Sequence, residues 1–504
     1  MKPKGSITIF ISLLLTVIIA FISANILSVK IQAGRAQAVN SADQALFSLF
    51  ALYDKDLLDE YDVFFLDAGL GSSGFNPSGL ADFITDTASY ILNPDKGSIV
   101  SPGKTLLKLT DEKTSIKAYT TASGHNGDIF CEQAVQYMKN TVMLRGAASL
   151  MGPEDNNFLS LPSYEAEGEK QNELDFNTAY ESVSKAAEEK AAESAEKNDS
   201  LSTEPIQNDG TPSAVPDSYF KIIPSVISLK GRSLTELCVP NPALISGSVF
   251  SASSFFSSGS RNTGAGVTKL TEDLSGAGSR LLLSEYIQTH CGSFLSPKQN
   301  SKIKYQTEYI IVGKNSDREN LDAVIKRIFL IRMGINALAI NTSPALKSEV
   351  AAVSTAISAA LMIPELQEVL TVLLTAGWAW CESLVDMRSL LKGNSAAILK
   401  SAENWQVSLE KIPELLNGSS SFEKPCGKGM KYSDYLCALL LQKDRIKTQD
   451  ALLKVVEDTI QNGHKRTSFR LDNCIDTLEI DFSVKSEDLI TFTANRRYSY
   501  RENT

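Results

Sequence analysis

The stretch GSITIFISLLLTVIIAFISANILSV (Gly5–Val29) contains 25 consecutive residues without a charged side chain. As a helix, residues 7–27 extend about 31 Å, enough to cross a hydrocarbon core of about 30 Å. A cleaved secretory signal would have a shorter apolar region, about 7–15 residues, ending in a small-x-small site. No such site directly follows this longer run. The stretch therefore predicts an uncleaved transmembrane helix (a signal-anchor) over residues 6–28, after a short cytoplasmic leader at residues 1–5.

The charges that flank this helix are nearly balanced, with Lys2 and Lys4 on one side and Lys30 and Arg35 on the other. The positive-inside rule alone therefore does not orient the helix. Because only the short leader precedes the span, we expect the N-terminus in the cytoplasm and the bulk of the chain outside the cell. The predicted location is the cell membrane, crossed once, with the lipid bilayer as the first partner.

An apolar stripe continues beyond the predicted span. Its members are spaced by 3, 4, 3 and 4 residues, which is one face of a helix or a coiled-coil seam: Val39, Ala42, Leu46, Leu49 and Tyr53. No Pro interrupts the segment, so we expect one rod from Ser6 to about Leu58, with residues 29–60 as its extracytoplasmic part. The stripe packs either on the protein's own globular part or on identical or related helices in a filament.

Three further regions follow the rod. Residues 61–164 are predicted to be a mixed α/β segment, with a short β-like run at Val63–Leu66. Residues 165–217 are an acidic low-complexity linker, since residues 165–209 hold 13 acidic and 4 basic side chains. Residues 218–504 are expected to form a helix-rich α+β domain.

Four apolar segments within residues 218–504 are interpreted as elements of a buried core. Tyr305–Gly313 is predicted to be a strand or a buried apolar run, and Asp317–Ile340 an amphipathic helix with an Asp start. Ala351–Ile363 and Val369–Trp380 lack charges, but each is too short to span a bilayer. Both are therefore interpreted as buried core helices.

The end of the chain has β character. Leu478–Val484 and Leu489–Tyr500 alternate between apolar and polar residues and are separated by a short polar turn, which predicts a hairpin. The predicted fold class is therefore α+β and helix-rich. It has an N-terminal transmembrane helix that continues into a long extracytoplasmic helix, then a mixed globular body with a C-terminal β-hairpin.

The residues that could carry chemistry are scattered. The net charge is −10 and no basic excess exists to neutralise phosphates, so nucleic acid is not an expected partner. The three histidines show no metal-ligand spacing, and no nucleophile, phosphate-loop or metalloprotease motif occurs. The acidic run from Asp54 to Asp67 lacks the Gly and terminal Glu of an EF-hand and is interpreted as a solvated helix end. We therefore expect no enzyme activity, cofactor or metal.

Several stretches together resemble a known family. They are KGSITIFISLLL (Lys4–Leu15), ALYDKDLLDEYDVFFLD (Ala51–Asp67), EYIIVGKNSDRENL (Glu308–Leu321), GWAWCESLVDMRSLLKG (Gly377–Gly393), ENW (Glu403–Trp405) and GMKYSDYL (Gly429–Leu436). The chain resembles an uncharacterised membrane-anchored family encoded beside tight-adherence (Tad) pilus genes in Gram-positive bacteria. Its amino terminus is similar to TadE/TadG-type pseudopilins.

The resemblance implies a structural role without catalytic residues, with pilin-like or pilus platform proteins as partners. A prepilin leader ends in Gly, which makes Gly5 and Ser6 the candidate processing site. The chain departs from prepilins at Phe10, where they carry Glu. The first functional hypothesis is a membrane-anchored, exported pseudopilin-like component of a Tad-type pilus or related secretion or adhesion apparatus. The alternative is a surface-anchored ligand-binding or adhesion module that acts without a pilus.

Overall fold

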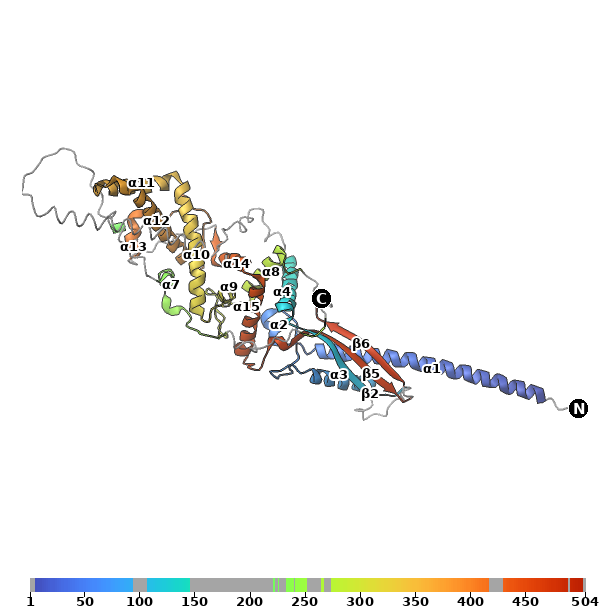
Figure 1. Cartoon of the computed structure of the whole chain (residues 1–504). Coiled ribbons are helices and arrows are strands. Elements are labelled where there is room, and N and C mark those ends of the chain that lie inside the picture. The colour runs from blue at the N-terminus through green and yellow to red at the C-terminus, as the bar shows by residue number, and fades with distance from the viewer. Residues whose placement is uncertain are drawn as a thin grey trace, which may run out of the picture. The chain divides into compact units, whose positions relative to one another are not determined.

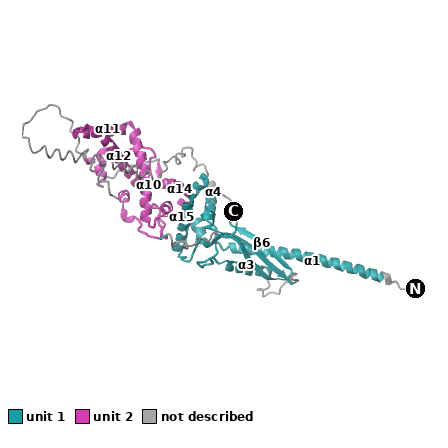
Figure 2. Cartoon of the chain, viewed as in Figure 1, with its two compact units in different colours: residues 1–145, 251–286, 445–504 teal, residues 146–250, 287–444 magenta. Residues whose placement is uncertain are grey.

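The computed structural model describes residues 5–93, 107–145, 221–222, 225, 233–239, 241–251, 264–266, 273–416, 429–487 and 490–501. The chain divides into two compact units (Figure 2). Unit 1 comprises residues 1–145, 251–286 and 445–504, and unit 2 comprises residues 146–250 and 287–444. The predicted helix-rich α+β class is confirmed. The predicted linker at 165–217 lies outside the described residues.

Unit 1 contains an antiparallel sheet with two helices packed on one face, α1 (Gly5–Phe50) and α3 (Pro77–Leu92) (Figure 1). Strand β5 (Cys474–Ser486) is central. It pairs with β2 (Leu109–Thr121) along one side, and with β6 (Thr491–Ser499) and β1 (Leu66–Asp67) along the other. Unit 1 also holds α2 (Lys55–Tyr61), α4 (Gly124–Arg145), most of α8 (Ala277–His290), and α15 (Arg445–Asp458).

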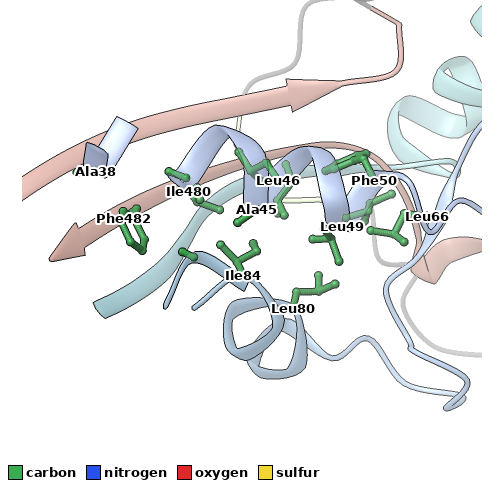
Figure 3. Close-up of a cluster of buried hydrophobic side chains, with 14 of the residues drawn as sticks. Ala38, Ala45, Leu46, Leu49, Phe50, Leu66, Leu80, Ile84, Ile480 and Phe482 are labelled. Atoms are coloured by element: carbon green, nitrogen blue, oxygen red, sulfur yellow. The ribbon is translucent and has the colours of Figure 1, made fainter. Parts of the chain in front are cut away.

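Side-chain alternation along β5 explains why the sheet packs on α1 and α3. Four apolar residues two positions apart are buried in one cluster with the two helices: Leu478, Ile480, Phe482 and Val484. Figure 3 labels Ile480 and Phe482 in this cluster. The intervening Asp481 is exposed. The predicted C-terminal hairpin is confirmed, because β5 pairs with β6 in antiparallel register from Thr477↔Ser499 to Lys485↔Thr491.

The predicted domain division is wrong at its C-terminal end. We expected residues 218–504 to form one domain, but residues 445–504 belong to unit 1. The reason is the apolar face of β5, which packs against helices from the first 92 residues, while β2 supplies its neighbouring strand. The described part of the 61–164 segment likewise contributes to unit 1 rather than forming a separate body.

The predicted rod is also shorter than expected, because α1 ends at Phe50 rather than near Leu58. Asp54 starts the next helix: its carboxylate accepts a hydrogen bond from the Leu57 amide at 3.0 Å. The Asp54 amide donates to the Phe65 carbonyl at 2.8 Å, which draws the chain away from the axis of α1. The predicted 29–60 rod is therefore two helices joined by a turn, and Tyr53 lies in that turn.

The acidic run that follows α1 is not simply a solvated helix end, which corrects that interpretation. Arg466 forms ion pairs with Asp54 at 2.6 Å, Asp56 at 2.9 Å and Asp67 at 3.2 Å. Three carboxylates thus converge on one guanidinium that is far away in the sequence. The short β1 overlaps the end of the predicted Val63–Leu66 run.

Unit 2 is mainly helical, and its principal helices lie where buried segments were predicted. Helix α10 (Asp317–Thr342) confirms the predicted 317–340 helix, and α11 (Pro344–Ala360) and α12 (Gln367–Leu390) match the two charge-free segments. The 305–313 segment is buried, but it forms α9 (Gln306–Val312) rather than a strand. The unit also contains α7 (Leu234–Cys238), β3 (Ser395–Ala396), α13 (Ile412–Leu416), β4 (Met430–Lys431) and α14 (Tyr432–Gln442).

A buried network of charges joins α10, α12 and the segment after β3. The guanidinium of Arg332 donates to one carboxylate oxygen of Asp386 from Nε at 3.0 Å and from Nη2 at 2.8 Å. The ammonium of Lys400 pairs with the other Asp386 oxygen at 2.6 Å and also contacts Glu382. Burial alone would raise the pKa of Asp386, but Arg332 and Lys400 hold it below its usual range. Two cations and two anions therefore balance in the core.

Replacing Asp386 with Ala should destabilise unit 2 by about 3–5 kcal/mol, because Arg332 and Lys400 would lose a buried counter-ion. Glu368→Ala on the same helix is the matched control, since Glu368 is exposed. All three tryptophans (Trp378, Trp380 and Trp405) lie in unit 2, so thermal unfolding followed by tryptophan fluorescence reports on this unit. Equal transition temperatures for the two variants would contradict the assigned role of the network.

Candidate membrane anchor

The first half of α1 carries its apolar side chains on the outside. From Ile7 to Val29 every residue is exposed, and the large apolar side chains range from 45% exposed at Ile18 to 70% at Phe21. These 23 residues extend about 34 Å as a helix, which matches a bilayer core of about 30 Å. Exposure all round the helix fits lipid rather than a single protein partner.

Three polar side chains in this half of α1 donate hydrogen bonds to backbone carbonyls of the same helix. Ser12 donates to the Ile9 carbonyl, Thr16 to the Ser12 carbonyl and Asn25 to the Phe21 carbonyl, each at 2.8 Å. A hydrogen-bonded hydroxyl or amide costs much less to place in hydrocarbon than an unpaired one. Ser12, Thr16 and Asn25 are therefore compatible with an apolar surrounding.

By length and composition, two helical segments within the described residues could cross a membrane, Ile7–Phe50 and Pro364–Leu390. They differ in burial. The most apolar window of the first is 0% buried, whereas that of the second is 61% buried inside unit 2. The second is therefore a core helix of the kind expected for residues 369–380, and α1 is the candidate anchor.

The second half of α1 packs on the protein's own sheet. Of the predicted stripe, Ala42, Leu46 and Leu49 are fully buried in the cluster with α3 and β5; Leu46 and Leu49 are labelled in Figure 3. Val39 is half-buried, and Tyr53 is half-buried beyond the helix end with its ring 5.4 Å from that of Phe64. Of the two interpretations left open, the structure therefore favours packing on the protein's own body.

The stripe is broader than predicted, because Ala38, Ala45 and Phe50 are buried in the same cluster. A strict two-heptad pattern omits these positions. The four-residue spacing of small side chains at Gly34, Ala38 and Ala42 was a usable signal, since small residues allow a sheet to approach a helix closely.

Gly34 marks where the exposed half of α1 meets the packed half. A Cβ atom at this position would lie 2.4 Å from Cζ of Phe492 on β6. The absence of a side chain at Gly34 therefore makes room for the Phe492 ring. Gly5 and Ser6, the candidate processing site, are the first two residues of α1. Cleavage between them stays a prediction.

Outside α1, burial strongly raises the pKa of two glutamates among the described residues: Glu457 on α15, to about 8, and Glu308 on α9. Glu308 on α9 is fully buried; one carboxylate oxygen accepts hydrogen bonds from the Phe294 amide at 2.9 Å and the Tyr432 hydroxyl at 2.8 Å. Its other oxygen has no hydrogen-bond partner. Burial raises the pKa of Glu308 to about 7. Among the described residues, no group of three or more His, Cys, Asp or Glu side chains could hold a metal ion.

Replacing Gly34 with Leu should destabilise the contact between α1 and β6 by about 1–3 kcal/mol, because the new side chain overlaps the Phe492 ring. Ala33→Leu is the matched control, since Ala33 is the preceding residue and is exposed. Hydrogen–deuterium exchange of the β6 amides, followed by mass spectrometry, should accelerate only in Gly34→Leu. Unchanged protection in both variants would show that the close approach is unimportant.

Unit 2 should lose stability as the pH rises from about 5 to 8, because folding raises the pKa of Glu308 from 4.5 to about 7. An acid with a raised folded pKa stabilises the fold while protonated, and this contribution, about 3 kcal/mol, disappears above the folded pKa. Glu308→Gln should reduce the pH dependence of tryptophan-detected unfolding. Glu319→Gln, at an exposed position of α10, should leave it intact. A wild-type slope in Glu308→Gln would rule out this assignment.

Comparison with known proteins places the chain in a family. A model of a family of unknown function, DUF5702, matches residues 213–486. No curated protein and no solved structure matches the chain. The matched region begins after α1 and ends at the last residue of β5, and it includes the described core of unit 2. Because the match covers more than half of the 504 residues, the chain belongs to the DUF5702 family of unknown function.

Proposed function

We propose that the protein is a membrane-anchored, exported, pseudopilin-like structural component of a Tad-type pilus or a related secretion or adhesion apparatus. The observation that carries the proposal is the division of α1 into an exposed apolar half (Ile7–Val29) and a half packed on an antiparallel sheet (Gly34–Phe50). Such a helix can hold a folded body at a bilayer without a flexible linker. The proposed role is structural rather than enzymatic.

In this proposal the N-terminus is cytoplasmic, and the two compact units lie on the outer side of the cell membrane. Pilin-like or platform partners would contact the half of α1 within the membrane. The reason is that Ala42, Leu46 and Leu49, the buried members of the predicted stripe, already pack against the protein's own sheet. This moves the proposed partner contact from the stripe to residues 7–29.

The second candidate function is a surface-anchored ligand-binding or adhesion module independent of a pilus. Burial of the stripe by the protein's own sheet favours this second candidate, because Ala42, Leu46 and Leu49 are buried without a partner protein. The two candidates share the anchor and differ in the neighbours of α1 within the membrane.

An Arg in place of Ile18, at the middle of the exposed half, should cost about 2.5–3.5 kcal/mol of membrane insertion. Fractionation of cells should then show the variant leaving the membrane or being degraded, while Ile18→Leu stays in the membrane. Full membrane retention of Ile18→Arg would overturn the anchor.

The membrane neighbours then distinguish the two candidates. A photoreactive amino acid placed at Phe10, which is 67% exposed, should crosslink to a pilin-like or platform protein if the protein is part of a pilus. Crosslinks to lipid alone, together with the absence of pilus ATPase and platform genes beside the gene, would favour the independent binding module.

A further inference from the structure

Strand β6 runs parallel to the packed half of α1, so each strand residue can be matched to the helix residue at the same level along the helix axis. We call this level the height of a residue. Three contacts fix the register. Phe492 lies against Gly34, Arg496 pairs with Asp43 at 3.0 Å, and the Tyr500 hydroxyl donates to the Phe50 carbonyl at 2.5 Å. The helix rises about 24 Å from residue 34 to residue 50, and the strand about 26 Å from residue 492 to residue 500. The two rises agree, so the helix and the strand stay in register between these contacts.

Extending this register places the β5–β6 turn at the end of the exposed apolar half. Ile490 lies two residues before Phe492, about 7 Å further along the strand direction toward the N-terminal end of α1. This is the height of about residue 29 of the helix. Glu487, in the turn itself, is at or beyond that height. The last exposed apolar residue of the candidate span is Val29, at the same height.

The end of α3 and the start of β2 reach the same height. The Asn93 side chain, which follows α3, donates to the Leu109 carbonyl at 3.1 Å, and Leu109 pairs with Ser486 at the end of β5. Tyr90 lies one turn of α3 before Asn93 and is 65% exposed. The end of α3, the start of β2 and the end of β5 thus lie at about the height of residue 29.

The side chains at this end suit a lipid–water boundary. Lys108 and Glu487 are both about two-thirds exposed and their charged atoms are 3.5 Å apart, while Lys485 pairs with Asp111 at 2.7 Å. Tyr is a residue type that concentrates at membrane interfaces, because its ring is apolar and its hydroxyl is polar. Charges of both signs beside an exposed Tyr match the phosphate and ammonium groups of phospholipids.

We propose that this end of unit 1, formed by Tyr90, Lys108 and Glu487, lies in the phospholipid headgroup layer of the bilayer that holds α1. The proposal rests on the anchoring of α1 proposed above and adds a second contact with the membrane. A headgroup layer is only about 5–8 Å thick. Because unit 1 begins beside residue 30 of the helix, directly after the exposed apolar half, no linker separates it from this layer. Headgroup contact and the packing of α1 together fix the tilt of unit 1.

The test places p-benzoylphenylalanine singly at four positions of the full-length chain: Ile18, Leu52, Tyr90 and Glu487. The protein is reconstituted in vesicles of phosphatidylcholine and phosphatidylglycerol, irradiated, and analysed by mass spectrometry for attached phospholipid. Leu52 is the control above the membrane, because it is 54% exposed and lies just beyond Phe50, the end of α1, which is about 30 Å along the helix from residue 30. Thermal unfolding of each variant checks that the substitutions leave the fold intact.

Phospholipid adducts at positions 18, 90 and 487 but not at position 52 are the expected result. Adducts at 18 without any at 90 or 487 would overturn headgroup contact while leaving the anchor in place. Adducts at 52 as abundant as those at 90 would also overturn it, because unit 1 would then lie on its side. An absence of adducts at position 18 would remove the anchor itself, and the headgroup contact with it.

Discussion

The packing of residues 34–50 of α1 against β5 and β6 is the contact on which the architecture of unit 1 depends. It joins the two ends of the chain, as the hydrogen bond between Tyr500 and Phe50 spans 450 residues of sequence. The entropy lost on closing a loop grows only logarithmically with its length, so a very long insertion adds little to the cost of this contact. Unit 2 can therefore lie in the sequence between the segments that build unit 1, provided the apolar face of β5 is buried by α1 and α3.

One helix serves two environments without a break. Around residues 7–29 the apolar side chains point in all directions, whereas from Gly34 onward the buried ones gather on one face and the opposite face is mostly polar, with Phe47 as an exposed exception. Gly34 lies at the change, where Phe492 reaches the helix backbone. In the anchoring that we propose, a stiff connection of this kind transmits orientation from the membrane to the folded body, which a flexible linker would not do. This property suits both the pilus component and the anchored binding module that we propose.

Unit 2 is held together by buried ion pairs, and removing one partner of such a pair would destabilise the fold. Arg332, Asp386, Lys400 and Glu382 are buried together with balanced charge, and backbone amides of Gln406 and Val407 donate to Glu382 at 2.9–3.2 Å. Because each charge keeps a partner, the network holds three separate segments in one arrangement. Glu308 differs, since one of its carboxylate oxygens has no hydrogen-bond partner and its pKa is near neutrality.

The amino-acid sequence by itself determined the features that depend on local pattern: the apolar run at 5–29, the stripe through Ala42, Leu46 and Leu49, and the hairpin. Charge-free length and two- or 3.6-residue periods are properties of neighbouring residues, so they can be read directly. Only the tertiary structure decided that the hairpin belongs with the N-terminal helix, that α1 stops at Phe50, and that Asp54, Asp56 and Asp67 face Arg466. These outcomes depend on contacts between residues hundreds of positions apart, and no local period encodes such a pairing.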